Sequence, residues 1–123
     1  MRNMSTRLHA YVDYVLASTS IFSPLLFGFG EGGIETLAPI GFGLLLILYN
    51  FFTDYELGLS KQIPVTYHLR LDIAAGLTMI LSPWLLRFHD NVYFPHILLG
   101  AALLINALLT GSEILKHAVR ERR

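Results

Sequence analysis

Two histidine–aspartate pairs recur in this sequence at one spacing, and they are the residues best suited to chemistry. His9 precedes Asp13 by four residues, and His68 precedes Asp72 by four. Residues four apart lie on the same face of a helix, so each carboxylate can hold its imidazole as an ion pair or by a hydrogen bond. The second pair follows the first at a single offset of 59, which indicates an internal duplication.

A Ser-Pro motif recurs at the same offset as the histidine–aspartate pairs. The matching residues are Ser23, Pro24 and Phe29 in the first copy and Ser82, Pro83 and Phe88 in the second. Each proline lies inside an expected helix, where it removes a backbone N–H and can kink the helix. The preceding serine can satisfy a carbonyl that the proline leaves free. Trp84 follows the second motif and is typical of the interfacial aromatic belt. We therefore interpret the motif as structural.

Composition points to a membrane protein with one domain. The chain has 123 residues, of which 54% are hydrophobic and 15% charged, with a mean hydropathy of +0.54. A soluble domain of this size has too much surface to hide so much apolar material. Its formal net charge is zero, so no nucleic-acid partner is expected. Cysteine is absent, which excludes disulfides, thiolate metal sites and a cysteine nucleophile.

Four apolar segments predict the architecture. They cover about residues 8–29, 34–52, 69–88 and 94–115, each near the ~20 residues that a helix needs to cross a bilayer. We predict an all-α, four-transmembrane-helix bundle built from two parallel two-helix repeats within a single domain, 1–123. The first repeat spans about 8–53 and the second about 68–115, joined by a linker at about 54–67. A basic C-terminal tail follows at 116–123.

The second helices of the two repeats match more weakly. Pro39 and Asn50 align with Pro95 and Asn106 at an offset of 56. Each asparagine lies 11 residues after its proline, and each aspartate lies 11 residues before its own, which is about 16 Å along a helix. If the prolines share one depth, a polar layer forms inside the membrane. Its predicted members are Asp13, Asn50, Asp72 and Asn106, together with His9 and His68.

Lysine and arginine set the expected orientation. One side of the membrane would carry eight of the nine basic residues: Arg2, Arg7, Lys61, Arg70, Lys116, Arg120, Arg122 and Arg123. The other side has Arg87, near the acidic Glu31, Glu35 and Asp90. We therefore expect both termini and the central linker to lie in the cytoplasm.

Three functions compete for the polar layer. In the leading interpretation its residues join the helices, and the protein is a non-enzymatic structural or partner-binding membrane module, with lipid and a second copy or another membrane protein as partners. The second is a small proton- or cation-coupled transporter or channel that uses Asp13 and Asp72. The third is a redox protein with haem held between His9 and His68. Standard catalytic motifs are missing, so no enzyme, resident metal or cofactor is predicted.

The duplicated Ser-Pro segment resembles the SPW repeat family of small bacterial membrane proteins. The resemblance covers both hairpins, from Leu8 to Leu109, and the second copy keeps the whole triplet Ser82-Pro83-Trp84. The first copy has Leu25 in place of tryptophan. The resemblance implies a pair of two-helix repeats in the inner (cytoplasmic) membrane. It implies no activity, so no catalytic residue is assigned from it.

Overall fold

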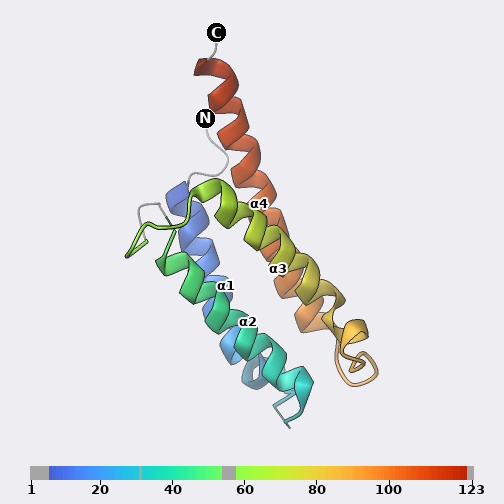
Figure 1. The fold of residues 1–123 in the computed structure, drawn as a ribbon. Coiled ribbons are helices and arrows are strands. Elements are labelled where there is room, and N and C mark those ends of the chain that lie inside the picture. Colours follow the sequence, from blue (N-terminus) through green and yellow to red (C-terminus); the bar gives the residue numbers. More distant parts are fainter. Residues whose placement is uncertain (1–5, 31, 54–57, 122–123) are drawn as a thin grey trace.

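Four helices make up the computed structural model, which describes residues 6–30, 32–53 and 58–121 (Figure 1). They are α1 (Thr6–Leu26), α2 (Ile34–Phe51), α3 (Val65–Leu85) and α4 (Phe94–Glu121). No strand occurs in these ranges, and one isolated β-bridge joins Thr53, at the end of the first repeat, to Ile63 in the linker. The all-α prediction is therefore confirmed.

The helices form two hairpins that lie side by side and run in the same direction. The beginnings of α1 and α3 and the ends of α2 and α4 lie at one end of the bundle, and the hairpin turns after α1 and α3 lie at the other (Figure 1). We call these the termini end and the turn end. This arrangement confirms the parallel repeats. Several residues of the orientation argument, Arg2, Glu31, Arg122 and Arg123, and linker residues 54–57 fall outside the described residues.

Helix boundaries differ from the prediction mainly at the termini end. α3 begins at Val65, inside the predicted linker, and α4 continues to Glu121, so the beginning of the predicted basic tail is helical. α1 and α3 both have 21 residues, and each has its proline two residues before the last residue of the helix. At 1.5 Å per residue, such helices are about 31 Å long, enough to cross the hydrocarbon layer.

Both first helices of the repeats end in the same backbone motif. In each repeat the N–H of the motif phenylalanine donates to the proline carbonyl, at 2.9 Å in the first repeat and 2.8 Å in the second. The preceding residue, Gly28 or Arg87, has a left-handed φ of 74° or 61°. This is the arrangement of a Schellman C-cap, which turns the chain sharply after the helix. The two repeats therefore share the same helix C-terminus as well as the same helix.

Small residues bring the two helices of each hairpin close together. A Cβ added to Gly43 of α2 would lie 2.5 Å from the Ala17 carbonyl oxygen of α1. In the second hairpin a Cβ on Gly100 would lie 2.5 Å from the Gly76 carbonyl oxygen. No side chain larger than hydrogen fits at these two positions. Close backbone approach of this kind is typical of helices that pack in a membrane.

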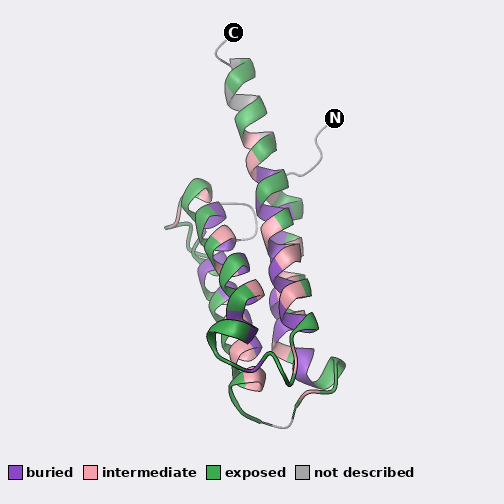
Figure 2. Ribbon diagram, turned by 90° about the vertical axis from the view of Figure 1, so that its right-hand side faces the viewer, coloured by how far each residue is buried: buried purple, intermediate pink, exposed green. Residues whose placement is uncertain are grey.

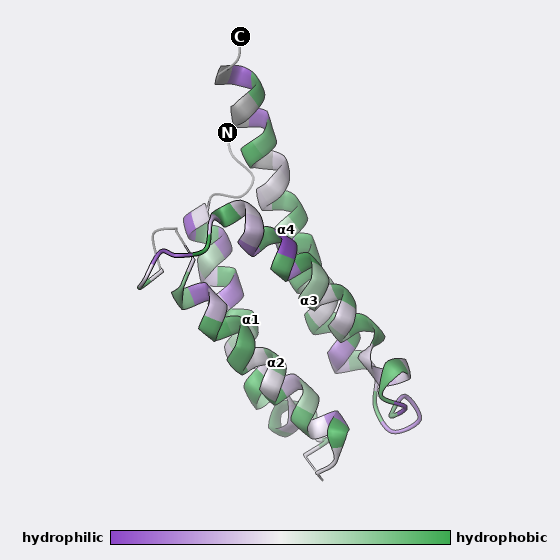
Figure 3. Cartoon of the chain, viewed as in Figure 1, coloured by the Kyte–Doolittle hydropathy of each residue, from purple (hydrophilic) through white to green (hydrophobic). Residues whose placement is uncertain are grey.

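Large apolar side chains cover the outside of the bundle. Figure 2 shows the buried residues on the inward faces of the helices, and Figure 3 shows hydrophobic residues spread along the outer faces. Leu25, Val15 and Leu85 are between 63% and 79% exposed. α2 and the Phe94–Lys116 part of α4 are long and apolar enough to cross a membrane. Helices α1 and α3 are less apolar because they carry the buried polar residues described next.

Candidate functional site

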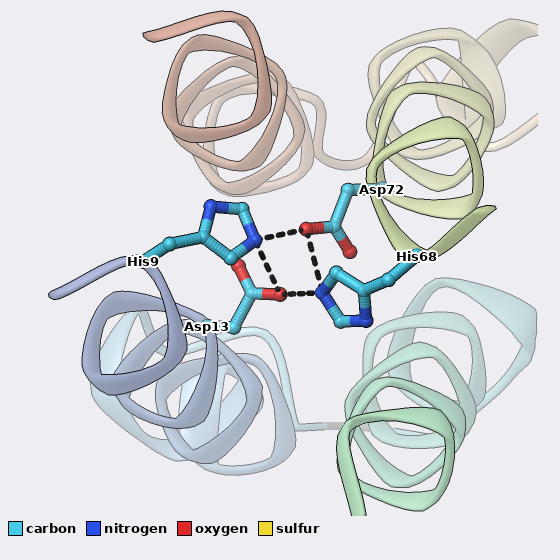
Figure 4. A group of neighbouring side chains, drawn as sticks. All are labelled: His9, Asp13, His68 and Asp72. Atoms are coloured by element: carbon cyan, nitrogen blue, oxygen red, sulfur yellow. Dashed lines mark hydrogen bonds and ion pairs between the residues drawn. The ribbon is translucent and has the colours of Figure 1, made fainter. Parts of the chain in front are cut away.

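A cluster of ionisable side chains lies inside the bundle, between helices α1 and α3. Each helix contributes a histidine and the aspartate one turn later, as the i, i+4 spacing predicts. The side chains point toward one another across the bundle axis, with α2 and α4 on the flanks (Figure 4). We call this group the His–Asp quartet; its members are His9, Asp13, His68 and Asp72.

The shortest contacts of the quartet cross between the repeats. His9 Nε2 lies 2.8 Å from Asp72 Oδ2, and His68 Nε2 lies 2.8 Å from Asp13 Oδ2. The contacts within one helix are longer, at 3.3 Å for His9 with Asp13 and 3.1 Å for His68 with Asp72. Nitrogen and oxygen atoms thus alternate around a small ring (Figure 4). Each histidine is held chiefly by the carboxylate of the other repeat.

Two threonines fix the tautomer of the histidines. His9 Nδ1 lies 2.9 Å from Thr110 Oγ1, and His68 Nδ1 lies 2.8 Å from Thr53 Oγ1. Each threonine hydroxyl donates its one hydrogen to the backbone carbonyl four residues earlier, at 2.9 Å and 2.7 Å. The hydroxyl oxygen can therefore only accept from the imidazole, so Nδ1 carries a proton in both histidines. Nε2 is the atom that faces the carboxylates.

The outer oxygen of each aspartate also has a donor. Asn106 Nδ2 donates to Asp13 Oδ1 at 2.9 Å, and the Tyr49 hydroxyl donates to Asp72 Oδ1 at 2.5 Å. Tyr49 belongs to α2 and Asn106 to α4, so all four helices contribute to the network. Every side-chain nitrogen and oxygen of the quartet has a hydrogen-bond or ion-pair partner.

Because the quartet is buried, the negative charge of its carboxylates must be neutralised within the bundle. All four side chains are between 0% and 1% exposed. The ion pairs of the quartet that the structure describes are all internal, and Arg7 and Arg70 are exposed. Two uncompensated carboxylates at such a site would be very costly. With Nδ1 already protonated in both rings, the two short Nε2–Oδ2 contacts require two further protons or another source of two positive charges.

A family model for the SPW repeat domain matches residues 7–110. The chain belongs to this family. The match covers the whole quartet and both hairpins as far as Thr110 in α4, and with the exposed apolar surface it identifies a membrane protein. Neither curated proteins nor solved structures gave a significant match.

Asn50 is not part of the network, contrary to the predicted polar layer. It is fully buried, but its Nδ2 donates to the Leu46 carbonyl of its own helix at 2.7 Å, and its Oδ1 has no partner among the described residues. The other five predicted members do come together. Asn50 therefore lies in the bundle interior without contacting the quartet, and the alignment of Asn50 with Asn106 does not hold for their contacts.

The contacts align the second helices of the SPW repeats at an offset of 57, not 56. Tyr49 and Asn106 have the same role toward the two aspartates, and Thr53 and Thr110 have the same role toward the two histidines. Gly43 and Gly100, at this same offset, make the equivalent close helix contacts. A one-residue error rotates a helix position by about 100°. That rotation is enough to remove Asn50 from the quartet.

The serines of the SPW motif replace the hydrogen bond that their prolines remove. Pro24 has no N–H for the carbonyl of Ser20, and Ser23 Oγ donates to that carbonyl at 2.7 Å. In the second repeat Ser82 Oγ donates to the Met79 carbonyl at the same distance. The predicted use of the serines is confirmed, and it explains why serine and proline are adjacent.

Trp84 lies on the outside of the turn end. It is 48% exposed, and its ring packs against those of His89 and Tyr93, with centroids 6.1 Å and 6.3 Å away. Leu25, which stands at this position in the first repeat, is 79% exposed. Neither residue contacts the quartet, so the motif and the chemically capable residues are separate features of the fold.

The geometry does not suit haem between His9 and His68. The two imidazoles meet edge to face, with centroids 5.3 Å apart and an angle of 80° between their planes. Both Nε2 atoms contact the same carboxylate oxygens, which occupy the space that a macrocycle would need. The arrangement therefore gives no support to the redox hypothesis.

Sequence reasoning missed Tyr49, Thr53 and Thr110. Their hydroxyls hold the outer atoms of the quartet, yet tyrosine and threonine are ordinary residues in a membrane helix. A signal was present, because Gly43 and Thr53 recur as Gly100 and Thr110 at one common offset. The proline and asparagine matches favoured an offset of 56 instead of 57, so this signal was not used.

Proposed function

We propose that this SPW repeat protein is a non-enzymatic membrane module in which the His–Asp quartet joins the two repeats and sets their register. The crossed contacts carry the proposal, because at 2.8 Å they are shorter than the contacts within each helix. Sliding one helix by a turn, about 5.4 Å, would break both of them. Buried polar groups are best known for fixing register in this way.

Substitution of the aspartates tests this role. Asp13→Asn and Asp72→Asn each remove one carboxylate from the ring, and Asp90→Asn is the control because its side chain is 91% exposed. We expect both quartet variants to lower the thermal midpoint of the purified protein in detergent, with the control unchanged. Quartet variants as stable as the control would contradict a joining role.

A proton-coupled transporter is the second candidate. The ring of Asp13, Asp72, His9 and His68 supports it, because its short contacts require two protons inside the bundle. In liposomes, an Asp13→Asn/Asp72→Asn variant that still folds should lose proton flux that the unaltered protein carries. Absence of flux from the unaltered protein would reject this candidate and leave the structural role.

Orientation in a bacterial cytoplasmic membrane is the next part of the proposal. Arg7, Lys61, Arg70 and Lys116 lie toward the termini end, which supports a cytoplasmic location for the termini. The chain has no cysteine, so single-cysteine variants are free of background. An impermeant maleimide should label Asn91→Cys on intact cells, and Ser60→Cys only after permeabilisation. The reverse pattern would invert the topology.

A second copy of the chain is the partner we propose. An apolar hollow runs between α3 and α4 and is lined by residues that include Leu69, Ile73, Leu108 and Gly111. A Cβ on Gly111 would contact only Leu69, at 3.9 Å, so this surface is open to another helix. We expect Leu108→Cys to form a disulfide-linked dimer in membranes. Leu44→Cys on the outer face of α2 is the control, and equal cross-linking of both would exclude a specific interface.

A further inference from the structure

The quartet has the ligand set of a metal centre. Its two Nε2 and two Oδ2 atoms all lie within 4.8 Å of one another, and the four nitrogen–oxygen separations run from 2.8 to 3.3 Å. A tetrahedral ion with bonds of about 2.0–2.2 Å separates its ligands by about 3.3–3.6 Å. To bind such an ion, the shorter edges of the ring would lengthen by about half an ångström. The ring would also pucker, because its diagonal separations, which reach up to 4.8 Å, must shorten to the same range.

The surrounding hydrogen bonds are those that a metal centre needs. Thr53 and Thr110 hold the protonated Nδ1 atoms, which directs the Nε2 lone pairs into the ring. Asn106 and Tyr49 hold the outer carboxylate oxygens, which leaves one oxygen of each aspartate for an ion. Such outer partners orient the ligands of metal sites, and their loss typically costs 10–100-fold in affinity.

The charge of the quartet also matches a divalent cation. Two neutral imidazoles and two carboxylates sum to −2, which one dication neutralises inside the bundle. The exchange balances as one dication bound for two protons released, because the protons of the two Nε2–Oδ2 contacts leave as the ion enters. Two nitrogen and two oxygen ligands favour Zn²⁺, whereas Ca²⁺ and Mg²⁺ require six or more oxygen ligands.

We propose that the His–Asp quartet binds one Zn²⁺ ion, with one histidine and one aspartate from each repeat. The ion would link α1 and α3 at the point where the repeats meet. This inference goes beyond the structural role, because that role is filled by the hydrogen-bonded ring alone. It adds a ligand whose binding can be measured directly.

Direct titration tests the proposal. The full chain, purified without a histidine tag and stripped with a chelator, is titrated with Zn²⁺ in detergent or nanodiscs. We expect one Zn²⁺ per chain and about two protons released per ion in a weakly buffered solution. Failure of the unaltered protein to bind, or binding without proton release, would overturn the proposal.

Variants locate the ion. We expect His68→Gln and Asp72→Asn to lose at least 100-fold in Zn²⁺ affinity, and Thr53→Val to lose 10–100-fold. His89→Gln is the control, because His89 is exposed and outside the quartet. Unchanged affinity in the quartet variants, or loss in the control, would place the ion elsewhere.

A spectroscopic measurement covers the case in which quartet variants do not fold. Co²⁺ bound to the unaltered chain should give the intense visible absorption of a four-coordinate site, and excess Zn²⁺ should abolish it. A weak octahedral spectrum would contradict the proposed ligand set. Zn²⁺ should also raise the thermal midpoint of the unaltered protein and of His89→Gln, since a ligand stabilises the state that binds it.

Discussion

At the scale of single residues, the hydroxyl of Tyr49 is the simplest group to remove from the network. Tyr49→Phe deletes only that hydroxyl and leaves Asp72 Oδ1 buried without a donor. An unsatisfied buried acceptor costs about 1–3 kcal/mol, and more when it is charged. We therefore expect Tyr49→Phe to lower the free energy of unfolding by at least ~1 kcal/mol, measured by denaturant titration in mixed micelles.

Tyr11→Phe provides the matched control for that measurement. Tyr11 lies on α1, near the quartet in sequence, but it is 52% exposed. Removal of its hydroxyl should change the free energy of unfolding by less than ~0.5 kcal/mol, as for most surface substitutions. Equal effects of the two substitutions would mean that the Tyr49 contact adds nothing to stability.

The residue scale also marks the limit of prediction from sequence. His9, Asp13, His68 and Asp72 could be predicted to share a layer, because identical residues recur at one offset and at helical spacing. Their crossed pairing could not, since both pairings have the same sequence pattern. Asn50 was misplaced because residue identity suggested an offset of 56, while side-chain reach depends on rotation about the helix axis. The four helices were predictable because apolar length alone determines them.

At the scale of elements, the Ser-Pro pair can be tested as a unit. Ser82→Ala removes the hydroxyl that donates to the Met79 carbonyl, which already lacks its helical N–H partner because residue 83 is proline. We expect a loss of about 1–3 kcal/mol in the free energy of unfolding. The double variant Ser82→Ala/Pro83→Ala should recover part of this loss, because the alanine N–H at position 83 can again bond that carbonyl.

Thr78→Ala is the control within the same helix. Thr78 Oγ1 bonds the Ala74 carbonyl at 2.7 Å, but this residue is exposed and the carbonyl keeps its helical N–H partner. Its removal should have almost no effect on unfolding. If the double variant were less stable than Ser82→Ala alone, the serine would have a role other than replacing the proline's missing bond.

Two glycines of α2 give a second test at this scale. A Cβ on Gly43 would meet the Ala17 carbonyl oxygen at 2.5 Å, whereas a Cβ on Gly41 meets nothing within 4 Å. Gly43→Ala should separate α1 from α2 and cost about 1–3 kcal/mol. Gly41→Ala should be neutral or stabilise by up to ~1 kcal/mol, because alanine favours the helix. Similar thermal midpoints for the two variants would contradict close packing at Gly43.

At the scale of the whole molecule, the quartet lies where the two hairpins meet. Its contribution to the free energy of unfolding depends on whether all four residues are present or only some of them. Removing one member leaves a buried charge without its partner, which typically costs about 3–5 kcal/mol. Replacing an entire buried ionic group by apolar residues is often neutral or stabilising. Comparing single substitutions in the quartet with replacement of all four residues therefore separates its effect on stability from its effect on the register of the helices.

We expect the complete replacement His9→Leu/Asp13→Val/His68→Leu/Asp72→Val to cost far less than the sum of its four single substitutions. The bundle keeps its apolar surface and its glycine contacts, so helix content measured by circular dichroism should be preserved. Without the crossed contacts, however, α1 and α3 lose the restraint on their relative depth. Amide resonances of the quadruple variant should then broaden or double in nanodiscs. A single sharp set of resonances would show that helix packing alone sets the register, and would leave ligand or proton binding as the reason for the quartet.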